Sequence, residues 1–313
     1  MSNLENTIDL SQFKIGKYIN QGSFGQVFEV LEKSTRKKYA AKISKERVDT
    51  MSKDSTLNLL REVNINASIK HPSILQFIGF SFKDFKNDDK PVIITELAQN
   101  GSLSNVIDYE SKGLSIPGWD STKKLINLYG IASGMSFLHS KNLLHRDLKL
   151  ENILCDDHLF PKLSDFGLSK KYYSDGFAST TQSIFGLKGT PTYFSPEIIQ
   201  DQSYTPAGDV YAFGIVAYEI ITTERAFSDF TIPQLFASIL NGKRPTIPSY
   251  VSEEYKKLIE RCWSQKAEDR PTFEQIVDEL KSDKFIITEI DEDDYHEYIK
   301  FIGKGGFSNV LLC

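Results

Sequence analysis

The sequence predicts an α+β fold in which a small, strand-rich lobe is followed by a larger helical lobe. Up to about residue 98, short runs rich in β-branched and aromatic residues alternate with turn residues, with one helical segment between them. After Gly101 the apolar residues recur at helical spacing. A chain of 313 residues is long enough for one large two-lobed domain, and strands followed by helices are typical of the α+β class.

The first lobe is expected to hold five strands and one helix. Strands at 13–19 and 27–31 flank a glycine turn, a third alternates over 38–43, and short apolar runs at 74–80 and 92–95 complete the set. Between the third and fourth strands, helical spacing predicts a helix from Lys53 to Lys70. We expect its apolar stripe to consist of Leu57, Leu60, Val63 and Ile65.

The second lobe is expected to be helical. A helix leading into His145 is predicted by an apolar face made of Leu125, Leu128, Ile131, Met135 and Leu138. Further helices are predicted at 210–221, 232–240, 255–262 and 273–280. The run at 210–221, which Gly214 and Glu219 interrupt, is too short to cross a bilayer and is typical of a buried helix.

Composition and charge exclude several classes of protein. With 40% apolar and 25% charged residues the chain can bury a sizeable core. A net charge of −5 argues against nucleic acid or an anionic membrane as the main partner. The three cysteines show no metal-ligand spacing, and the first residues lack the pattern of a signal peptide. We therefore expect a cytoplasmic protein without membrane insertion.

The segment His145-Arg146-Asp147-Leu148-Lys149 brings together groups that phosphoryl transfer requires. The transition state of this reaction is loose and highly charged, so catalysis depends on positioning and charge neutralisation. Asp147 can accept the proton of a hydroxyl, and Lys149 provides a cation near the transferred phosphate. Asn152 and Asp165, the latter in Asp165-Phe166-Gly167, supply two oxygen ligands for Mg2+.

This combination resembles the catalytic loop and metal-binding triplet of the protein kinase family. The resemblance covers residues 13–281 and implies the two-lobed protein kinase fold, with a small lobe at 13–98 and a large lobe at 99–281. It implies ATP and Mg2+ as cofactors and proteins as substrates. Residues 1–12 are expected to be an N-terminal extension, and 282–313 an acidic tail. The glycine-rich stretch 301–310 in that tail is either the truncated start of a second such domain or an accidental match.

A glycine-rich loop and a lysine are expected to hold the nucleotide. The loop at 22–27 lies between two predicted strands, where glycines let the backbone approach phosphates. Alone it would more often be a simple hairpin turn, and Asn20 replaces the first glycine of the family pattern. Lys42 would otherwise be a solvated strand residue, but Glu62 is its expected ion-pair partner, which would aim the ammonium at the α- and β-phosphates.

The run Thr95-Glu96-Leu97-Ala98 resembles the hinge between the lobes, whose backbone groups bind adenine, with Thr95 at the back of the pocket. The ATP-binding residues that the resemblance implies are Ile19, Asn20, Gln21, Gly22, Ser23, Phe24, Gly25, Gln26, Val27, Ala40, Lys42, Glu62, Thr95, Glu96 and Ala98.

Other positions carry structural or regulatory expectations. Asp209 precedes a buried apolar run, where an acidic residue is costly unless bonded, and in the family it braces the catalytic-loop backbone. Glu197 is expected to pair with Arg270. Asn66, where the family has an apolar residue, is hypothesised to loosen the active position of its helix. Arg146 is expected to receive a phosphate from the activation segment, unless the hydroxyls there merely solubilise a loop; the candidates are Ser179, Thr180, Thr181 and Ser183.

The acceptor class follows from local features. Lys149 and Thr190 resemble serine/threonine kinases, whereas Arg261-Cys262-Trp263 resembles the tyrosine-kinase end of the family. The mixture resembles the tyrosine-kinase-like group, whose members mostly phosphorylate serine and threonine. One alternative is an inactive pseudokinase scaffold, which the presence of Lys42, Asp147 and Asp165 opposes. The other is a small-molecule phosphotransferase of related fold, which the expected pairing of Glu197 with Arg270 disfavours.

Overall fold

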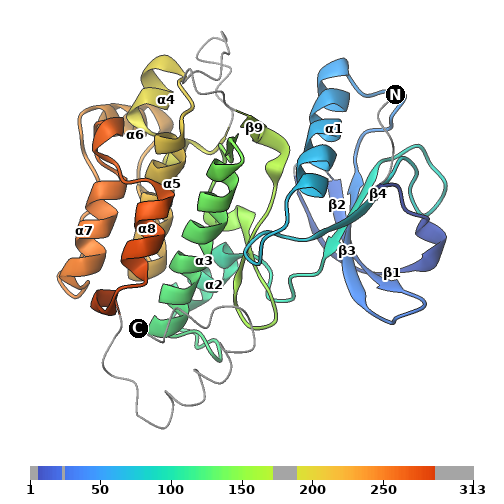
Figure 1. The fold of residues 1–313 in the computed structure, drawn as a ribbon, viewed down its shortest axis with the longest axis horizontal. Coiled ribbons are helices and arrows are strands. Elements are labelled where there is room, and N and C mark those ends of the chain that lie inside the picture. Colours follow the sequence, from blue (N-terminus) through green and yellow to red (C-terminus); the bar gives the residue numbers. More distant parts are fainter. Residues whose placement is uncertain (1–5, 23–24, 172–188, 286–313) are drawn as a thin grey trace.

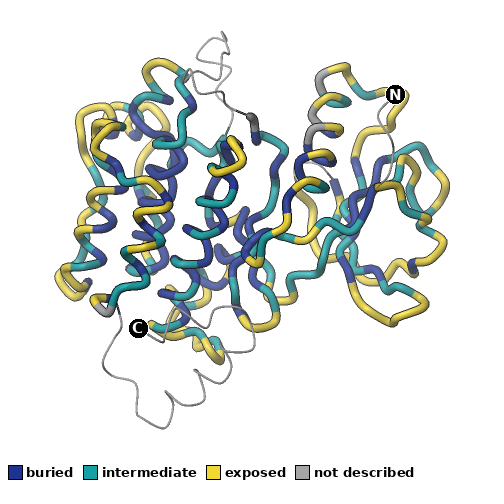
Figure 2. Tube along the Cα trace, in the orientation of Figure 1, coloured by how far each residue is buried: buried dark blue, intermediate teal, exposed yellow. Residues whose placement is uncertain are grey.

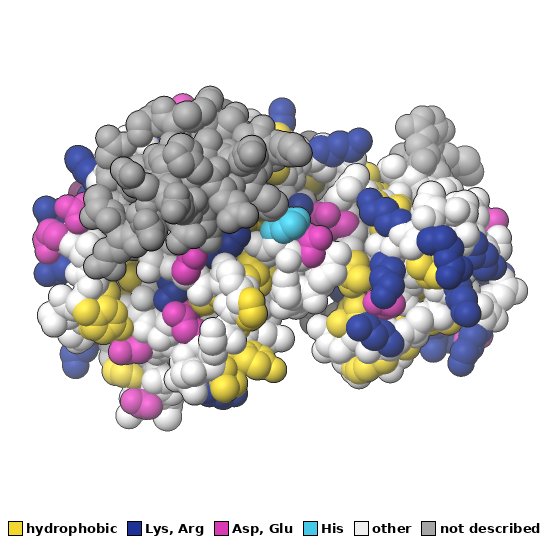
Figure 3. Space-filling model, turned by 90° about the horizontal axis from the view of Figure 1, so that it is seen from below, with side chains coloured by type: hydrophobic (Ala, Val, Ile, Leu, Met, Phe, Trp, Pro, Cys, Tyr) yellow, Lys and Arg dark blue, Asp and Glu magenta, His cyan; other side chains and the backbone are white. Residues whose placement is uncertain are grey.

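The computed structural model describes residues 6–22, 25–171 and 189–285 in two lobes (Figure 1). The strands of the small lobe lie to one side and the helices of the large lobe to the other, as the α+β pattern predicts. Seen from below, the surface is hollowed between the lobes, and Lys and Arg side chains gather on the small lobe (Figure 3). In the described part of the chain, no helix is long and apolar enough to span a membrane.

The small lobe is built on an antiparallel sheet with the strand order β1-β2-β3-β5-β4. The strands are β1 (Phe13–Gln21), β2 (Gly25–Glu32), β3 (Lys38–Ser44), β4 (Phe77–Ser81) and β5 (Val92–Glu96). Four of them match the predicted positions. The fifth, β4, was expected to begin at residue 74 but begins at Phe77. The reason is that Leu75 donates its backbone N–H to Leu163 O (2.9 Å), and Ile74 forms only an isolated bridge with Leu163, so these residues join the lobes instead.

Helix α1 (Lys53–Ser68) packs against this sheet, and the predicted apolar stripe was right for Val63 and Ile65, which are buried, but wrong for Leu57 and Leu60. Leu57 and Leu60 are 57% and 37% exposed, whereas Leu59 and Val63 are buried against β4 and β5. Residues four apart lie on the same face of a helix, so Leu59 and Val63 both face the sheet. Glu62, which precedes Val63, is buried on the same side of the helix. Leu57 and Leu60 extend away from that face.

The large lobe consists of α2 (Leu103–Ser111), α3 (Ser121–Ser140), α4 (Pro196–Asp201), α5 (Pro206–Thr222), α6 (Ile232–Leu240), α7 (Glu253–Cys262) and α8 (Phe273–Leu280). All five predicted helices are present. Every member of the predicted face of α3 is buried, and α5 is buried along almost its whole length, as Figure 2 shows. The first turn of α8 is fastened by a reciprocal capping box between Thr272 and Gln275, which satisfies N–H groups that a helix start leaves unpaired.

Four short strands carry the loops that face the small lobe. They are β6 (Leu143–Leu144), β7 (Ile153–Cys155), β8 (Pro161–Leu163) and β9 (Lys170–Lys171). Strand β6 pairs with β9, and β7 forms a hairpin with β8. The loop that begins at His145 therefore connects β6 to β7, each paired with a different strand, and ends in the turn η2 (Leu150–Asn152).

Candidate active site

Asp209, in the first turn of α5, holds the backbone of the loop at 145–149. Its Oδ2 accepts hydrogen bonds from His139 Nε2 (2.9 Å) and from the backbone N–H of His145 (3.0 Å), and its Oδ1 accepts from the N–H of Arg146 (2.9 Å). Burial alone would raise the pKa of Asp209, but the hydrogen bond and charge of His139, the charge of His145 and the backbone N–H of Arg146 together outweigh it and lower that pKa. The buried carboxylate is thus ionised and satisfied, as the sequence analysis predicted.

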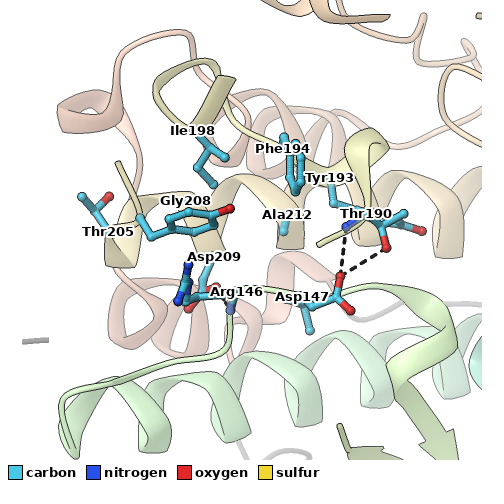
Figure 4. A pocket seen from close by; sticks show the side chains of 12 residues that line it. Arg146, Asp147, Thr190, Tyr193, Phe194, Ile198, Thr205, Gly208, Asp209 and Ala212 are labelled. Carbon is cyan, nitrogen blue, oxygen red and sulfur yellow. Dashed lines mark hydrogen bonds between the residues drawn. The ribbon is translucent and has the colours of Figure 1, made fainter. Parts of the chain in front are cut away.

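Asp147 lies among three other polar side chains. Its Oδ2 accepts from Asn152 Nδ2 (2.9 Å) and lies 3.0 Å from Lys149 Nζ. Its Oδ1 accepts from the N–H (3.1 Å) and the hydroxyl (3.2 Å) of Thr190, and Lys149 Nζ donates to the same hydroxyl at 2.7 Å. Figure 4 shows Thr190 above Asp147 with both hydrogen bonds drawn. Thr190 therefore lies beside Asp147 and Lys149.

Lys42, on β3, forms the ion pair that the sequence suggested. Its Nζ lies 3.2 Å from Glu62 Oε1 and 3.9 Å from Asp165 Oδ1. Burial lowers the pKa of Lys42, but Glu62 and then Asp165 act against it, and the net pKa is raised. The ammonium therefore stays charged while both carboxylates face it. Asp165 adopts a left-handed backbone conformation (φ 62°), and Phe166 after it is buried against His145.

These groups open onto one cavity of about 460 Å3 between the lobes. Lys42, Glu62, Asp147, Lys149 and Asp165 all line it. The described residues hold no group of three or more His, Cys, Asp or Glu side chains that could bind a metal ion. The donor set still fits Mg2+, which is commonly bound by one or two protein oxygens together with substrate phosphates and water. Asp165 offers a carboxylate, and Asn152 offers its amide oxygen because its nitrogen donates to Asp147.

The glycine-rich segment joins β1 and β2. Asn20 pairs with Val27 and Gln21 with Gln26, so the residue that replaces the first family glycine is accommodated as an ordinary strand residue. Gly22 donates its N–H to Gly25 O (2.9 Å). A Cβ atom on Gly25 would lie 1.7 Å from the carbonyl oxygen of Ile43, so only glycine fits there. Ile19 is exposed at the end of β1, and Ser23 and Phe24 lie outside the described residues.

The strands behind this segment form a common face. Val27 stands opposite Lys42, and Ala40 stands opposite Thr95. Directly paired residues share a face of a sheet, and so do residues two apart in a strand, so these four side chains point toward the same side. The chain leaves β5 through Glu96 and Ala98. The Glu96 carboxylate accepts from the N–H of Gln76 (2.8 Å) and lies 3.5 Å from Lys162 Nζ.

Arg146 lies beside Asp147 but faces the large lobe. Its guanidinium carbon is 3.9 Å from the centre of the Tyr204 ring, and its Nη1 donates weakly to Leu168 O (3.5 Å). Among the described residues, its buried Nε has no hydrogen-bond partner. The proposed phosphate acceptors Ser179, Thr180, Thr181 and Ser183 lie outside the described residues, so that expectation is not tested. Asn66 donates its side-chain N–H to Glu62 O at 2.8 Å, one turn back along α1, and its effect on the helix stays a hypothesis.

Two further carboxylates lie in the large lobe, one half-buried at Glu197 and one buried at Glu219. Glu197 binds Arg270 through two hydrogen bonds (2.7 and 2.9 Å), as predicted, and the Arg270 side chain is fully buried. Glu219 was missed. Its carboxylate accepts from the Tyr193 hydroxyl (2.7 Å), three residues beyond Thr190, and from the N–H of Ala226 (3.2 Å). Burial raises the pKa of Glu219 to about 7. An acidic residue within the apolar run at 210–221 was the available signal, by the same reasoning that identified Asp209.

Comparisons with known proteins agree with this geometry. A family model described as the protein kinase domain matches residues 13–280. The putative serine/threonine-protein kinase/receptor R831 of Acanthamoeba polyphaga mimivirus is 33% identical over 87% of this chain and 16% of its own length. The probable serine/threonine-protein kinase drkC of Dictyostelium discoideum is 32% identical over 88% of this chain and 35% of its own. The serine/threonine-protein kinase STY17 of Arabidopsis thaliana is 30% identical over 93% and 47%.

The chain spans less than half the length of each of these three relatives, and the matched region covers both lobes. The matched residues include the ion pair on β3 and α1, the loop that carries Asp147, and the pair of Glu197 with Arg270. The chain belongs to the protein kinase domain family, and its small β-rich lobe and larger helical lobe form the two-lobed α+β fold of that family.

Proposed function

We propose that this chain is an ATP-dependent protein kinase that transfers the γ-phosphate to serine and threonine hydroxyls of protein substrates. The observation that carries the proposal is the arrangement of Asn152, Lys149 and Thr190 around the Asp147 carboxylate, which lines the same cavity as the Lys42–Glu62 pair. The names of the relatives, all serine/threonine-protein kinases, support the same activity for the matched region.

The residues divide the work of phosphoryl transfer by their chemistry. Asp147 orients the acceptor hydroxyl and takes its proton, because its carboxylate is held by Asn152 and Thr190 with its oxygens directed into the cavity. Lys149, 3.0 Å from Asp147, provides positive charge where the phosphoryl group passes. Asp165 and the amide oxygen of Asn152 would hold Mg2+, which when bound neutralises charge on the phosphates.

The nucleotide is proposed to lie under the sheet of the small lobe. Lys42 is aimed by Glu62 toward the α- and β-phosphates, and the backbone at 20–22 and 25–26 would cover the phosphates. Val27 and Ala40, which share the face of Lys42, would contact the adenine, with Thr95 behind it. Ile19 and the backbone of Glu96 and Ala98 would complete the adenine site. A protein kinase domain implies ATP and a divalent metal, and Mg2+ is the metal that we propose.

The choice of serine and threonine as acceptors is supported by the contact between Lys149 and Thr190. The 2.7 Å hydrogen bond between them holds both side chains next to Asp147. We infer that this arrangement lets a short hydroxyl side chain approach the Asp147 carboxylate at reactive distance. An inactive pseudokinase is not favoured, since Lys42 is present with Glu62 and Asp165 at 3.2 and 3.9 Å from its ammonium. We also propose that the kinase domain spans residues 13–281 and that the protein belongs to the tyrosine-kinase-like group. We further propose that it is cytoplasmic and has no nucleic acid among its partners.

A phosphorylation assay tests the proposal. The chain is incubated with Mg2+, labelled ATP and a generic protein substrate, and the product is hydrolysed to its phospho-amino acids. We expect phosphoserine and phosphothreonine, and we expect Asp147→Asn to remove nearly all transfer while nucleotide binding stays within about threefold of wild type. The matched control is Asp157→Asn, because Asp157 is an exposed carboxylate in the β7–β8 turn. More than about a tenth of the wild-type rate in Asp147→Asn, or mainly phosphotyrosine, would contradict the assigned roles.

A further inference from the structure

The segment 6–12, expected to be an N-terminal extension, lies against the small lobe. It runs beside β4, which is the edge strand of the sheet, and in Figure 1 it is the dark blue start of the chain on the side away from the large lobe. Ile8 donates its backbone N–H to Phe80 O, and Phe80 donates its own to Asn6 O, both at 2.9 Å. Thr7 and Phe80 therefore form a parallel bridge that closes the edge of the sheet.

Side chains of the segment fill a hollow in the sheet. A Cβ atom on Gly79 would lie 2.1 Å from Ile8 Cγ2, so the isoleucine occupies the space that the glycine leaves open. Ile8 and Leu10 pack against the buried cluster on the face of the sheet opposite α1, which includes Val92 and Ile94. The segment then ends in the short turn η1 (Leu10–Gln12), where Lys33 binds the carbonyl oxygens of Ser11 and Gln12.

Phe80 links this segment to the catalytic ion pair. Its backbone is bonded to the segment, while its ring is buried among Leu59, Val63 and Ile93. Leu59 and Val63 are the residues of α1 that face the sheet, and Glu62 lies between them in the helix. The position of Phe80 therefore bears directly on the face of α1 that presents Glu62 to Lys42 at 3.2 Å.

We propose that the β4 edge at Phe80, with the hollow at Gly79, is a docking groove for an extended segment carrying two apolar residues two positions apart. The chain's own Ile8 and Leu10 occupy it. Strand addition at a sheet edge combines backbone hydrogen bonds with side-chain pockets, and here two hydrogen bonds flank Phe80, Ile8 fills the hollow at Gly79, and Leu10 packs beside it from the turn η1. Occupancy of the groove positions Phe80, and through it the helix face that presents Glu62. The inference rests on the proposed function for its labelling and kinase readouts, whereas peptide binding and amide exchange at β4 are measured without nucleotide.

The first experiment separates the segment from the domain. A chain that lacks residues 1–12 is titrated with the synthetic peptide of residues 1–12, and three signals are followed: amide hydrogen exchange at β4, labelling of Lys42 by an acyl-phosphate nucleotide probe, and kinase rate. We expect the shortened chain to lose about tenfold in labelling and rate, and to recover both saturably with the peptide. The same peptide with Ile8→Asp should neither protect β4 nor restore labelling. A folded shortened chain that labels at the full rate, or that ignores the wild-type peptide, would overturn the proposal.

A point variant decides the matter if the shortened chain does not fold. Ile8→Ala in the full chain removes the side chain from the hollow, and Ile8→Val keeps most of it. The control is Ile15→Ala on β1, because Ile15 is 40% exposed. We expect Ile8→Ala, at temperatures well below its melting point, to slow Lys42 labelling by about fivefold, with Ile8→Val and Ile15→Ala near wild type. If Ile8→Ala lowers only the melting temperature and labels at the wild-type rate, the segment merely stabilises the lobe and the proposal fails. If wild type and all three variants label Lys42 normally but none of them transfers phosphate, the result would instead count against the proposed function.

Discussion

Replacing Asp209 by asparagine tests whether the loop that carries Asp147 is held by α5. The carboxylate accepts three hydrogen bonds, two at Oδ2 and one at Oδ1, and it is buried. An amide of the same shape offers one accepting oxygen and an NH2 group that only donates. In either orientation of the amide, a backbone N–H of His145 or Arg146 then faces another donor.

The structure allows the size of the effect to be worked out. Losing one hydrogen bond to a charged group in a buried site costs about 3 kcal/mol of unfolding free energy. In a chain of this size that corresponds to a fall of about 5–10 °C in melting temperature. Arg146 directly precedes Asp147, so a small displacement of its backbone moves the catalytic carboxylate. Misplacement by about 1 Å reduces the rate about 100-fold, and we expect kcat to fall by that order while the KM for ATP changes little.

The assay combines urea denaturation with steady-state phosphorylation of a generic protein substrate. Because the pKa of Asp209 is lowered, its stabilising effect is complete above its ordinary value of 3.8 and is lost only as the pH falls below it. The variant and wild type are therefore compared at pH 8, where Asp209 is ionised. Asp157→Asn, on the exposed turn, is the matched control. A variant that loses the expected stability but keeps kcat within about threefold of wild type would refute the positioning role.

Three further predictions follow from the buried charges. Glu219→Gln should change how the free energy of unfolding depends on pH. The pKa of Glu219 is raised to about 7 from an ordinary 4.5, so the folded wild type keeps this proton at a pH where the unfolded chain has lost it. Wild type should therefore lose about 3 kcal/mol of stability relative to the variant as the pH rises from about 4.5 to 8. Parallel pH profiles in urea denaturation would contradict this. Lys42→Met should weaken nucleotide binding and lower kcat, because Glu62 and Asp165 lose their shared cation, and an unchanged kcat/KM for ATP would rule this role out. Arg270→Met should cost about 3–5 kcal/mol, since it leaves the Glu197 carboxylate unpaired, whereas Arg261→Met at an exposed pair should cost less than about 1 kcal/mol. Equal losses in the two arginine variants would show that burial is not the cause.

The helices and most strands were predictable because they depend on local periodicity. The face of α3 made by Leu125, Leu128 and Met135 was read from spacing alone, and all three residues are buried. For α1 the same reasoning chose Leu57 and Leu60, which are exposed. Periodicity shows that a helix has an apolar face, but where several leucines compete, the position of the sheet decides which of them is buried.

The chemistry of the site was predictable at the level of residue types, since a carboxylate, an amide and two lysines at these spacings suit few reactions other than phosphoryl transfer. Their convergence was not predictable from composition or spacing. Lys42 comes from β3, Glu62 from α1, and Thr190 from the segment before α4, yet Lys42 meets Glu62 and Thr190 meets Asp147. Such distances are set by the packing of distant segments.

The sequence by itself determined the family, the reacting groups and the order of the secondary structure, because these depend on residue identity and local spacing. Only the tertiary structure decided the raised pKa of Glu219 and the place of Ile8. A pKa depends on how completely other elements remove water from the carboxylate, and the apolar run around Glu219 does not state what surrounds it. Ile8 belongs to a short polar segment that looks dispensable along the chain. Its role follows from the open edge of β4 and from the missing side chain of Gly79, and these features exist only in the folded sheet.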